Sequence, residues 1–305
     1  MSTALALDYK EEILRLKKEK NAIVLVHNYQ REDFYDIADF IGDSLGLCRQ
    51  AAQTDADIIL FCGVHFMAES AAILNPGKKV VVPFIDAGCA MADMVEVRDL
   101  RSFKQKHPDA AVVTYVNSTA GIKALSDICC TSSNAVEVVR SMEEEKIIFV
   151  PDKNLAAYVA RHVKDKEIIP WDGYCPIHHH LNAEYVQEMR KEFPKAKVIA
   201  HPECKPEVLD IADHIASTSG MIEKAENDDS EEFFVLTECG MTERLKRSLP
   251  KKKFYGLCNV CFDMKKNTLE AAYDALKNEG PVVRVDHKIA DRARKAFDRM
   301  FAVTS

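Results

Sequence analysis

Three cysteines, Cys89, Cys175 and Cys261, stand near equivalent positions of a sequence pattern that occurs three times in this chain. When residues 22–89 are shifted by 88 and by 174 positions, Cys89 arrives within two residues of Cys175 and of Cys261. Three related domains around a pseudo-threefold axis would bring these thiols together. Three thiolates from distant parts of a chain suit a 4Fe-4S cluster whose fourth iron stays free to act as a Lewis acid. One zinc ion with three thiolates and water is the alternative, and it would be a weaker electrophile.

Polar side chains follow the first predicted strand of each copy, where a buried strand leaves its sheet. They are His27, Tyr115 and His201 at the strand end, and Tyr29, Asn117 and Glu203 two residues later. Imidazole, phenol and carboxylate groups in one place can donate and accept the protons of enol, imine and dehydration chemistry. For the histidines, the alternative is a structural role with satisfied hydrogen bonds. Because both follow an apolar strand at the same repeat position, we expect them to line a cleft.

A second set of polar residues recurs where a helix is expected to begin. It consists of Asp43 with Ser44, Thr131 with Ser132, and Ser217 with Thr218. Hydroxyl groups and unpaired backbone N–H groups at a helix start attract anions, and the helix dipole adds to that attraction. Three such starts around one axis would bind a substrate that carries several anionic groups. The alternative is that these residues only cap their helices, which is the commoner role of an isolated Ser or Thr.

The other cysteines and a run of histidines carry weaker signals. Cys258 forms C-x-x-C with Cys261, a spacing that zinc sites, redox pairs and iron–sulfur ligands share, so Cys258 is interpreted as a spare thiol beside the ligand. In the run 178–180, only His178 is expected near the metal. The cysteines in apolar patterns are expected to be buried as small hydrophobic residues: Cys48, Cys62, Cys129, Cys130, Cys204 and Cys239.

The elements that must position these residues alternate between strand and helix in each copy. The segment 22–30 aligns with 110–118 and 196–204, and the match continues without gaps. Such alternation predicts parallel sheets with right-handed crossovers, which carry binding residues at the carboxyl ends of their strands. We therefore predict an α/β fold of three homologous three-layer α/β/α domains, with small parallel sheets around a pseudo-threefold axis. The expected domains are residues 1–88, 89–174 and 175–264, followed by a C-terminal helical tail over 265–305.

The composition argues against nucleic acid and membrane partners. The 305 residues are 47% hydrophobic and 29% charged, and the formal net charge is -7. Phosphate backbones attract basic faces, so this charge disfavours nucleic acid as the partner. No segment approaches the roughly 18 to 20 unbroken apolar residues of a membrane span. The N-terminal residues lack the pattern of an export signal, and a cytoplasmic location is expected. The glycine-rich loops of the common nucleotide sites do not follow any predicted strand.

Nine short segments, spread over nearly the whole chain, match one known family in their order and spacing. They are HNYQ (27–30), IADFIGDSL (37–45), NPGKKVVVP (75–83), YVNST (115–119), TSSNAVEVV (131–139), PDKNLAAYV (151–159), HPEC (201–204), STSGM (217–221) and CFDMKKNTL (261–269). In these motifs the chain resembles the quinolinate synthase family, the A protein of de novo NAD synthesis. The segments around Cys89 and Cys175 depart from the commoner family forms, although the cysteines keep their places.

The resemblance implies a fold, a cofactor and a reaction. It implies three α/β domains around a pseudo-threefold axis, with one 4Fe-4S cluster held by Cys89, Cys175 and Cys261. It also implies an enzyme of the transferase class that condenses iminoaspartate, also called iminosuccinate, with dihydroxyacetone phosphate. The products would be quinolinate, phosphate and water. An L-aspartate oxidase or dehydrogenase would supply the iminoaspartate.

The same resemblance implies roles for individual residues. Glu203 is the expected general base, Tyr29 and His201 relay protons, and Tyr115 orients an enol or carbonyl. The positions that match substrate-binding residues of the family are His27, Ser44, Tyr115, Val116, Asn117, Ser132, His201, Pro202, Glu203 and Thr218.

Two other readings of the chain remain open at this point. A diphthamide-synthesis-like protein also has three repeated domains that each give a cysteine to a cluster, but it uses S-adenosylmethionine and acts on a protein. The small polar residues at the strand ends fit a closed small-molecule cavity better. A non-catalytic iron–sulfur sensor would not require the threefold polar set. Turnover of iminoaspartate and dihydroxyacetone phosphate to quinolinate is expected only if the chain is a quinolinate synthase, and not for either of these two alternatives.

Overall fold

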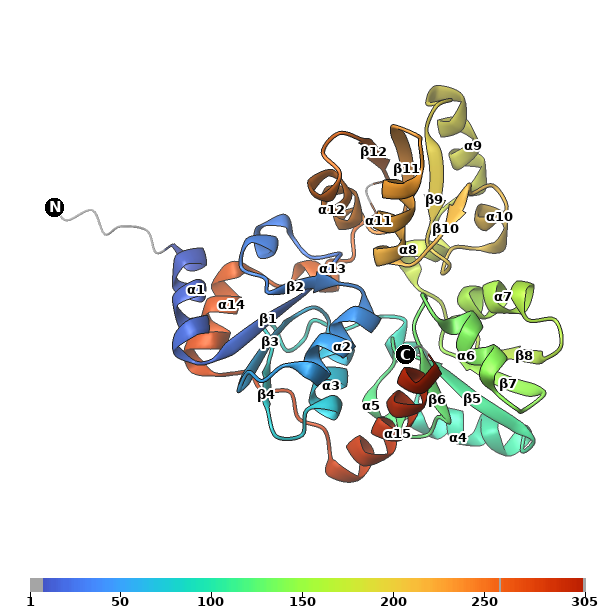
Figure 1. Cartoon of the computed structure of the whole chain (residues 1–305). Coiled ribbons are helices and arrows are strands. Elements are labelled where there is room, and N and C mark those ends of the chain that lie inside the picture. The colour runs from blue at the N-terminus through green and yellow to red at the C-terminus, as the bar shows by residue number, and fades with distance from the viewer. Residues whose placement is uncertain (1–7, 258, 304–305) are drawn as a thin grey trace.

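The computed structural model describes residues 8–257 and 259–303, which form three lobes around a common centre (Figure 1). Each lobe contains a four-stranded sheet, and every strand pair within these sheets is parallel. The strand order is the same in all three: the second, first, third and fourth strand of the lobe lie side by side. The predicted α/β class with three small parallel sheets is confirmed.

The strands fall where the sequence repeat places them. The first sheet contains β1 (Ala22–His27), β2 (Phe40–Gly42), β3 (Ile58–Cys62) and β4 (Lys79–Val81). The second contains β5 (Ala110–Tyr115), β6 (Ile128–Cys130), β7 (Lys146–Val150) and β8 (Glu167–Pro170). The third contains β9 (Lys197–Ala200), β10 (His214–Ile215), β11 (Glu232–Leu236) and β12 (Lys253–Gly256). The two central strands of each sheet, β1 with β3, β5 with β7 and β9 with β11, are apolar over most of their length, as is typical of strands that helices cover on both faces.

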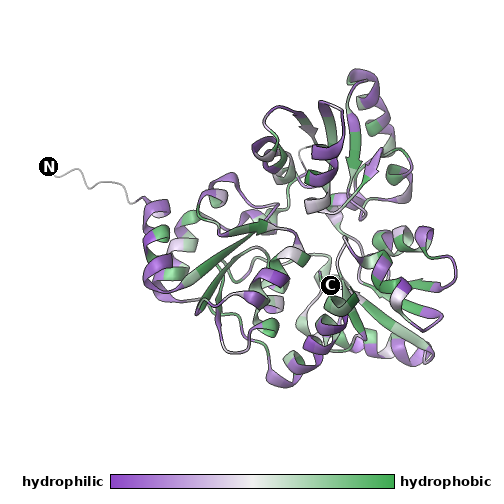
Figure 2. Cartoon of the chain, in the orientation of Figure 1, coloured by the Kyte–Doolittle hydropathy of each residue, from purple (hydrophilic) through white to green (hydrophobic). Residues whose placement is uncertain are grey.

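Helices cover both faces of each sheet, so each lobe has three layers. The first sheet lies between α1 (Tyr9–Glu19) with η1 (Glu32–Asp36) and α2 (Ser44–Gln53) with α3 (His65–Leu74). The second lies between α4 (Val97–Lys106) with α5 (Ala120–Lys123) and α6 (Ala135–Ser141) with α7 (Lys153–His162). The third lies between α9 (Ala183–Glu192) with α10 (Pro206–Leu209) and α11 (Thr218–Asn227) with α12 (Gly240–Ser248). Figure 2 shows the apolar strands inside each lobe and the polar helix faces outside.

An aspartate before the second strand ties it to the first strand in all three lobes. Each aspartate donates its backbone N–H to a valine carbonyl, at 2.9 Å in every case. Its carboxylate accepts the N–H of the same valine at 2.7 to 2.8 Å. The pairs are Asp39 with Val24, Asp127 with Val112, and Asp213 with Val198. This pair of hydrogen bonds fixes the start of the edge strand against the first strand, and it occurs in the same form in all three lobes.

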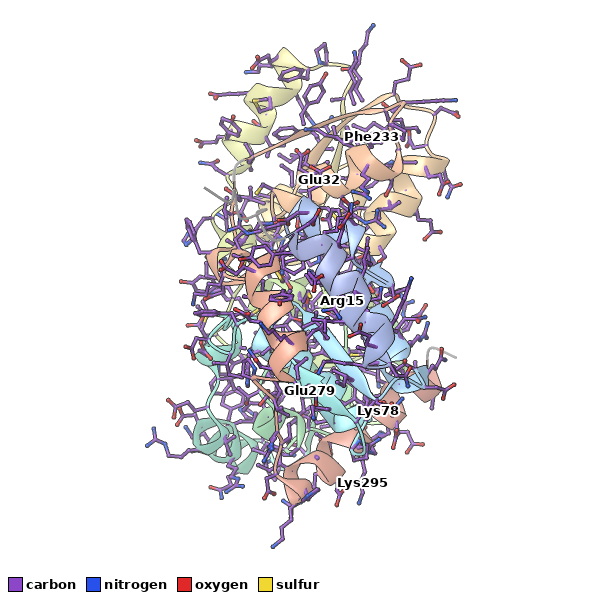
Figure 3. The ribbon with its side chains drawn as sticks, turned by 90° about the vertical axis from the view of Figure 1, so that its left-hand side faces the viewer. Arg15, Glu32, Lys78, Phe233, Glu279 and Lys295 are labelled. Atoms are coloured by element: carbon purple, nitrogen blue, oxygen red, sulfur yellow. The ribbon has the colours of Figure 1, made fainter. Side chains whose placement is uncertain are left out.

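The segment after residue 265 divides into two helices with different partners. After the short α13 (Phe262–Lys265), α14 (Leu269–Asn278) packs beside α1 in the first lobe (Figure 3). Helix α15 (His287–Val303) contacts α3 of the first lobe and α5, α6 and β6 of the second, and its Phe297 is fully buried. Helix α14 thus completes the helical cover of the first lobe, and α15 joins the first lobe to the second.

Among the described residues, no helix is both long and apolar enough to cross a membrane.

Candidate active site

A cavity of about 250 Å³ lies where the carboxyl ends of the three sheets meet. The thiols of Cys89, Cys175 and Cys261 all line it. So do the predicted site residues from each repeat, namely His27, Tyr29, Ser44, Tyr115, Asn117, Ser132, His201, Glu203 and Thr218. Val116 and Pro202 are buried but are not among the lining residues; the Val116 N–H donates to the Cys130 carbonyl at 2.9 Å.

The three cysteines occupy equivalent places after the last strand of each sheet. Cys175 is the N-cap of α8 (Pro176–His179), Cys261 is the N-cap of α13, and Cys89 precedes η2 (Ala92–Met94). Burial raises the pKa of all three thiols, to about 12 for Cys89, and the backbone N–H three residues further on partly offsets each rise. Cys89 also interacts electrostatically with Cys261 and with Cys175.

The donor set fits an iron–sulfur cluster. Buried thiols with raised pKa values become ligands when a metal displaces their protons, and N–H groups directed at sulfur stabilise bound thiolates. Cys48, Cys62, Cys129, Cys130 and Cys204 are buried and do not line the cavity, as expected for structural thiols. Cys239 is half-buried, which differs from the expectation, because it lies at the start of α12 rather than within the core. Cys258 lies outside the described residues.

Glu203 lies at the centre of the polar side of the cavity. Its Oε2 is 2.6 Å from His178 Nδ1 and 3.7 Å from His201 Nδ1, and the two imidazole rings stack with centroids 4.5 Å apart. Burial opposes the ionised form of Glu203, but the His201 and His178 rings and the Tyr115 hydroxyl together lower its pKa to about 2. The carboxylate is therefore deprotonated at neutral pH.

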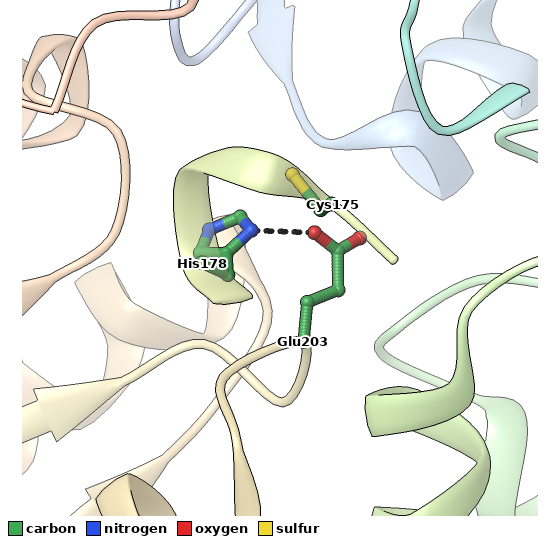
Figure 4. Close-up of side chains that lie close together, drawn as sticks. All are labelled: Cys175, His178 and Glu203. Carbon is green, nitrogen blue, oxygen red and sulfur yellow. Dashed lines mark ion pairs between the residues drawn. The ribbon is translucent and has the colours of Figure 1, made fainter. Parts of the chain in front are cut away.

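Glu203 and His178 also stand close to one cysteine. Ligand atoms of Cys175, His178 and Glu203 lie within 4.8 Å of one another, and Figure 4 shows the three side chains facing each other. Sulfur, imidazole and carboxylate form a donor set that a single divalent ion can use. The region around Cys175 is thus compatible with a metal cofactor.

The two phenols of the site remain protonated hydrogen-bond donors. Burial, with the charge of Glu203, raises the pKa values of Tyr29 and Tyr115 well above 10. The Tyr29 hydroxyl is 2.5 Å from Thr237 Oγ1 and 3.4 Å from His178 Nε2. Because His178 Nδ1 reaches Glu203, the three residues form a continuous path from phenol to carboxylate.

The two histidines at the first strand ends are neutral. Burial lowers the pKa of both to about 3. The charge of Lys265 adds to this effect for His27 and the neighbouring His178 ring adds to it for His201, while Glu203 opposes it for both. In each ring, Nδ1 accepts the backbone N–H two residues later, at 3.1 Å in His27 and 3.4 Å in His201. A neutral ring that accepts at Nδ1 carries its proton on Nε2. Both rings therefore offer one N–H donor.

Of the three helix starts that were expected to bind anions, those of the first and third copies are present, and that of the second copy is displaced. Helix α2 begins at Ser44 and α11 at Thr218, as predicted, and Asp43 and Ser217 cap these helices through their side chains, which is the role that the alternative gave them. In the second copy the prediction was wrong, because Asn134 Oδ1 accepts the Thr131 N–H at 2.6 Å and forms a turn. Helix α6 begins only after that turn, so Ser132 lies on a loop that faces the cavity.

Asn28 controls the direction of the Thr218 hydroxyl. The Arg244 guanidinium can only donate, and its Nε lies 3.4 Å from Asn28 Oδ1, which turns Asn28 Nδ2 toward Thr218 Oγ1 at 2.9 Å. Because Thr218 Oγ1 accepts this bond, its own proton is available to a ligand in the cavity. Asn117 adds an acceptor, since its Oδ1 is buried without a hydrogen-bond partner in the described part of the chain.

The sequence search missed Thr237 and gave His178 only a place near the metal. Thr237 follows β11 and bonds His178 Nε2 at 2.8 Å, so it orients that ring. The available signal is its position: Thr237 is the first residue after the third strand of its copy, an end of the sheet where polar residues also occur. Asn28 belongs to the motif HNYQ (27–30), but its role depends on a contact with Thr218 from another copy, which the motif alone does not predict.

Comparison with known proteins identifies one family over nearly the whole chain. The sequence model of the family described as Quinolinate synthetase A protein matches residues 11–302, which include every residue that lines the cavity. The quinolinate synthase of Methanosarcina barkeri (strain Fusaro / DSM 804) is 55% identical over 295 residues, covering 96% of this chain and 97% of that protein. That of Thermodesulfovibrio yellowstonii is 52% identical over 297 residues, covering 97% and 98%. That of Alkaliphilus metalliredigens is 50% identical over 295 residues, covering 96% and 97%.

Proposed function

The chain belongs to the quinolinate synthase family, and from that premise we propose that it condenses iminoaspartate with dihydroxyacetone phosphate to quinolinate, phosphate and water. The observation that carries the proposal is the convergence of three cysteines and a Glu–His–Tyr network on one small cavity. The reaction forms a ring by loss of phosphate and water, and it needs anion binding, proton transfer and an electrophile. The cavity offers groups for each of these.

We assign the cofactor as one 4Fe-4S cluster per chain, held by Cys89, Cys175 and Cys261. The support is the donor set itself: three thiols at equivalent places, facing one cavity. When bound, such a cluster supplies a Lewis-acidic iron that polarises a hydroxyl or carboxylate of the substrate without net redox change. The competing assignment is one divalent ion on Cys175, His178 and Glu203. Iron and sulfide counts distinguish the two, because the cluster contains both elements and the single ion no sulfide.

Binding of the substrates is assigned to the hydroxyl and imidazole donors around the cavity. Iminoaspartate carries two carboxylates and dihydroxyacetone phosphate one phosphate, so the site must receive several negative charges. The α11 start with Thr218, the α2 start with Ser44, and the loop with Ser132 supply hydroxyl and N–H donors. The Nε2–H groups of His27 and His201 add two neutral donors. Val116 and Pro202, which are buried beside the cavity, contribute by holding the backbone of the neighbouring lining residues in place.

Glu203 is the proposed general base. Its carboxylate lies in the cavity beside His178, His201 and Tyr115, where it can accept a proton from a carbon or nitrogen of the condensing substrates. Tyr29 and His201 relay protons, and the geometry adds His178 between Tyr29 and Glu203. Tyr115, which contacts Glu203 and Ser132, orients an enol or carbonyl oxygen as a protonated donor.

The place in metabolism rests on the family resemblance. We propose that the product enters de novo NAD biosynthesis in the cytoplasm, and that an L-aspartate oxidase or dehydrogenase supplies iminoaspartate. Unstable imine substrates favour such a supply close to the enzyme.

Turnover of the anaerobically reconstituted chain tests the function. Protein with a full complement of iron and sulfide, mixed with iminoaspartate and dihydroxyacetone phosphate, should release quinolinate and inorganic phosphate in equal amounts. The same protein should not consume S-adenosylmethionine. Absence of quinolinate from protein that carries a complete cluster would refute the proposed reaction. Cys204→Ala, which removes a buried thiol away from the cavity, is the control for loss of a cysteine as such.

A further inference from the structure

Two fully buried carboxylates outside the proposed chemistry stand at equivalent positions of the repeat. Asp152 and Glu238 are each the second residue after the third strand of their lobe, and both are 0% exposed. Val64 occupies the equivalent position in the first lobe. Among the described residues, no cation forms an ion pair with Asp152, whereas Lys265 Nζ lies 3.3 Å from Glu238 Oε1. Burying a carboxylate costs free energy unless it is well bonded, so two such groups call for a physical reason.

Both carboxylates bind the backbone of a cluster cysteine. Asp152 Oδ2 accepts the Cys175 N–H at 3.0 Å, and Glu238 Oε1 accepts the Cys261 N–H at 3.2 Å. The other oxygen of each bonds the start of the following helix, from Leu155 N at 2.7 Å and from Gly240 N at 2.7 Å. Each carboxylate therefore joins a cysteine loop to a helix that is anchored in the core of the same lobe.

Helix capping alone does not explain these residues. A Ser or Thr would cap α7 at less cost, because a hydroxyl is cheaper to bury than a carboxylate. A hydroxyl has one oxygen, however, and cannot bond the helix start and the cysteine loop together from two separate atoms. Only a carboxylate offers two acceptor oxygens that both receive N–H groups. The feature that the two copies share, beyond the cap, is the bond to the cysteine.

We propose that Asp152 and Glu238 are positioning residues that fix the backbones of Cys175 and Cys261, and thereby the directions of two of the three sulfurs. This inference deepens the cluster assignment and rests on it. A fixed backbone N–H restrains the φ rotation of the cysteine, so its Cα–Cβ bond keeps its direction toward the cavity whether or not the cluster is bound. Cys89 has Val64 in place of a carboxylate and is held by apolar packing against the cores of the first and second lobes. The cluster is thus held by two braced ligands and one unbraced ligand.

Iron release to a chelator tests the proposal without reference to activity. Asp152→Asn and Glu238→Gln keep the shape of each side chain but replace one acceptor oxygen with a donor NH2 group. We expect each variant, reconstituted anaerobically, to release iron to a ferrous chelator about tenfold faster than the parent chain, as the loss of one buried hydrogen bond would give. The melting temperature of the cluster-free protein should stay within a few degrees of the parent value.

Asp127→Asn is the matched control. Asp127 also accepts a backbone N–H, from Val112 at 2.7 Å, but it lies before an edge strand and makes no hydrogen bond with a cysteine in the described part of the chain. Its substitution should leave the rate of iron release unchanged. The proposal is overturned if the Asp152 and Glu238 variants fold and release iron at the parent rate, or if Asp127→Asn accelerates release as much as they do.

Amide hydrogen exchange in the unsubstituted, cluster-free chain gives a test that no folding defect can obscure. The N–H groups of Cys175 and Cys261 should exchange at least about tenfold more slowly than that of Cys89. Equal exchange of all three would contradict the proposal. A chain that binds no iron would refute the cluster assignment, while this exchange comparison would still decide whether the carboxylates brace the two loops.

Discussion

The two ends of the three sheets differ in how closely the copies repeat. Where the edge strand begins, Asp39, Asp127 and Asp213 make the same pair of hydrogen bonds with nearly the same distances. At the carboxyl ends, the equivalent positions hold different residues, such as Tyr29, Asn117 and Glu203. The repeated part builds the fold three times. The varied part builds one asymmetric site, because a substrate without threefold symmetry needs different groups on each side.

The cysteine loops show the same contrast within the site. The thiols themselves are repeated in all three copies, while the carboxylate that braces the loop is present in two. Substitutions in the repeated and the varied parts should therefore have different effects.

The largest effect is expected from a proposed cluster ligand. Cys89→Ala should abolish the brown iron–sulfur absorbance and lower bound iron by more than the roughly 10- to 100-fold that is typical for loss of a second-shell partner. Far-ultraviolet circular dichroism should remain that of the folded protein, because Cys89 is only partly buried. Cys204→Ala is the control and should keep its iron. Retention of a full cluster by the Cys89 variant would refute the ligand assignment.

The next largest effect concerns the varied strand ends. Glu203→Gln should lower kcat by about 10²- to 10⁴-fold, since the amide cannot accept the proton that a general base takes. Iron content should not change. Glu207→Gln, in the same segment but on the surface, removes a carboxylate paired with Lys205 and should leave kcat at the parent value. Equal loss in both variants would show that the segment, not the base, had been damaged.

A moderate effect is expected where two copies cooperate. Asn28→Asp replaces the amide donor with a second acceptor, so the Thr218 hydroxyl should turn its proton toward the introduced carboxylate and away from the cavity. Arg244 next to this position should stabilise the new charge. Binding of inorganic phosphate, measured by calorimetry, should weaken about tenfold.

Thr218→Val provides the matched comparison because it removes the hydroxyl and keeps the shape. It should weaken phosphate binding to a similar degree, and the double variant should be no weaker than either single one. Additive losses would mean that Asn28 does not act through Thr218.

The smallest effects belong to the repeated part. Asp39→Ala, Asp127→Ala and Asp213→Ala each remove a hydrogen bond from a valine N–H and an ion pair, with Lys17, Lys104 and Arg190 respectively. Because these carboxylates are about a third or more exposed, each substitution should lower the free energy of unfolding by only about 1 to 2 kcal/mol. The three losses, from urea denaturation of the cluster-free protein, should be similar. A much larger loss for one copy would show that the lobes are less alike than their bonds suggest.

The sequence predicted the strands well because an ungapped repeat and apolar runs depend on local residues. It predicted the lining residues after the first strands for the same reason. It did not predict the late start of α6, because the Asn134 turn competes with the helix and an offset of residues cannot show that competition. Nor did it predict the roles of Asn28, Thr237 and the buried carboxylates. Their partners come from other elements or other lobes, and a pattern within one segment contains no information about such contacts.

The return of α14 to the first lobe has a consequence for synthesis of the chain. Ala272, Ala275 and Leu276 share an apolar cluster with Ile13 and Leu16 of α1. A ribosome that has completed the second and third lobes has therefore not yet finished the first, whose cluster still lacks one covering helix. During that interval the nascent chain exposes an apolar surface that favours aggregation. A product truncated after the third lobe would keep this surface exposed permanently.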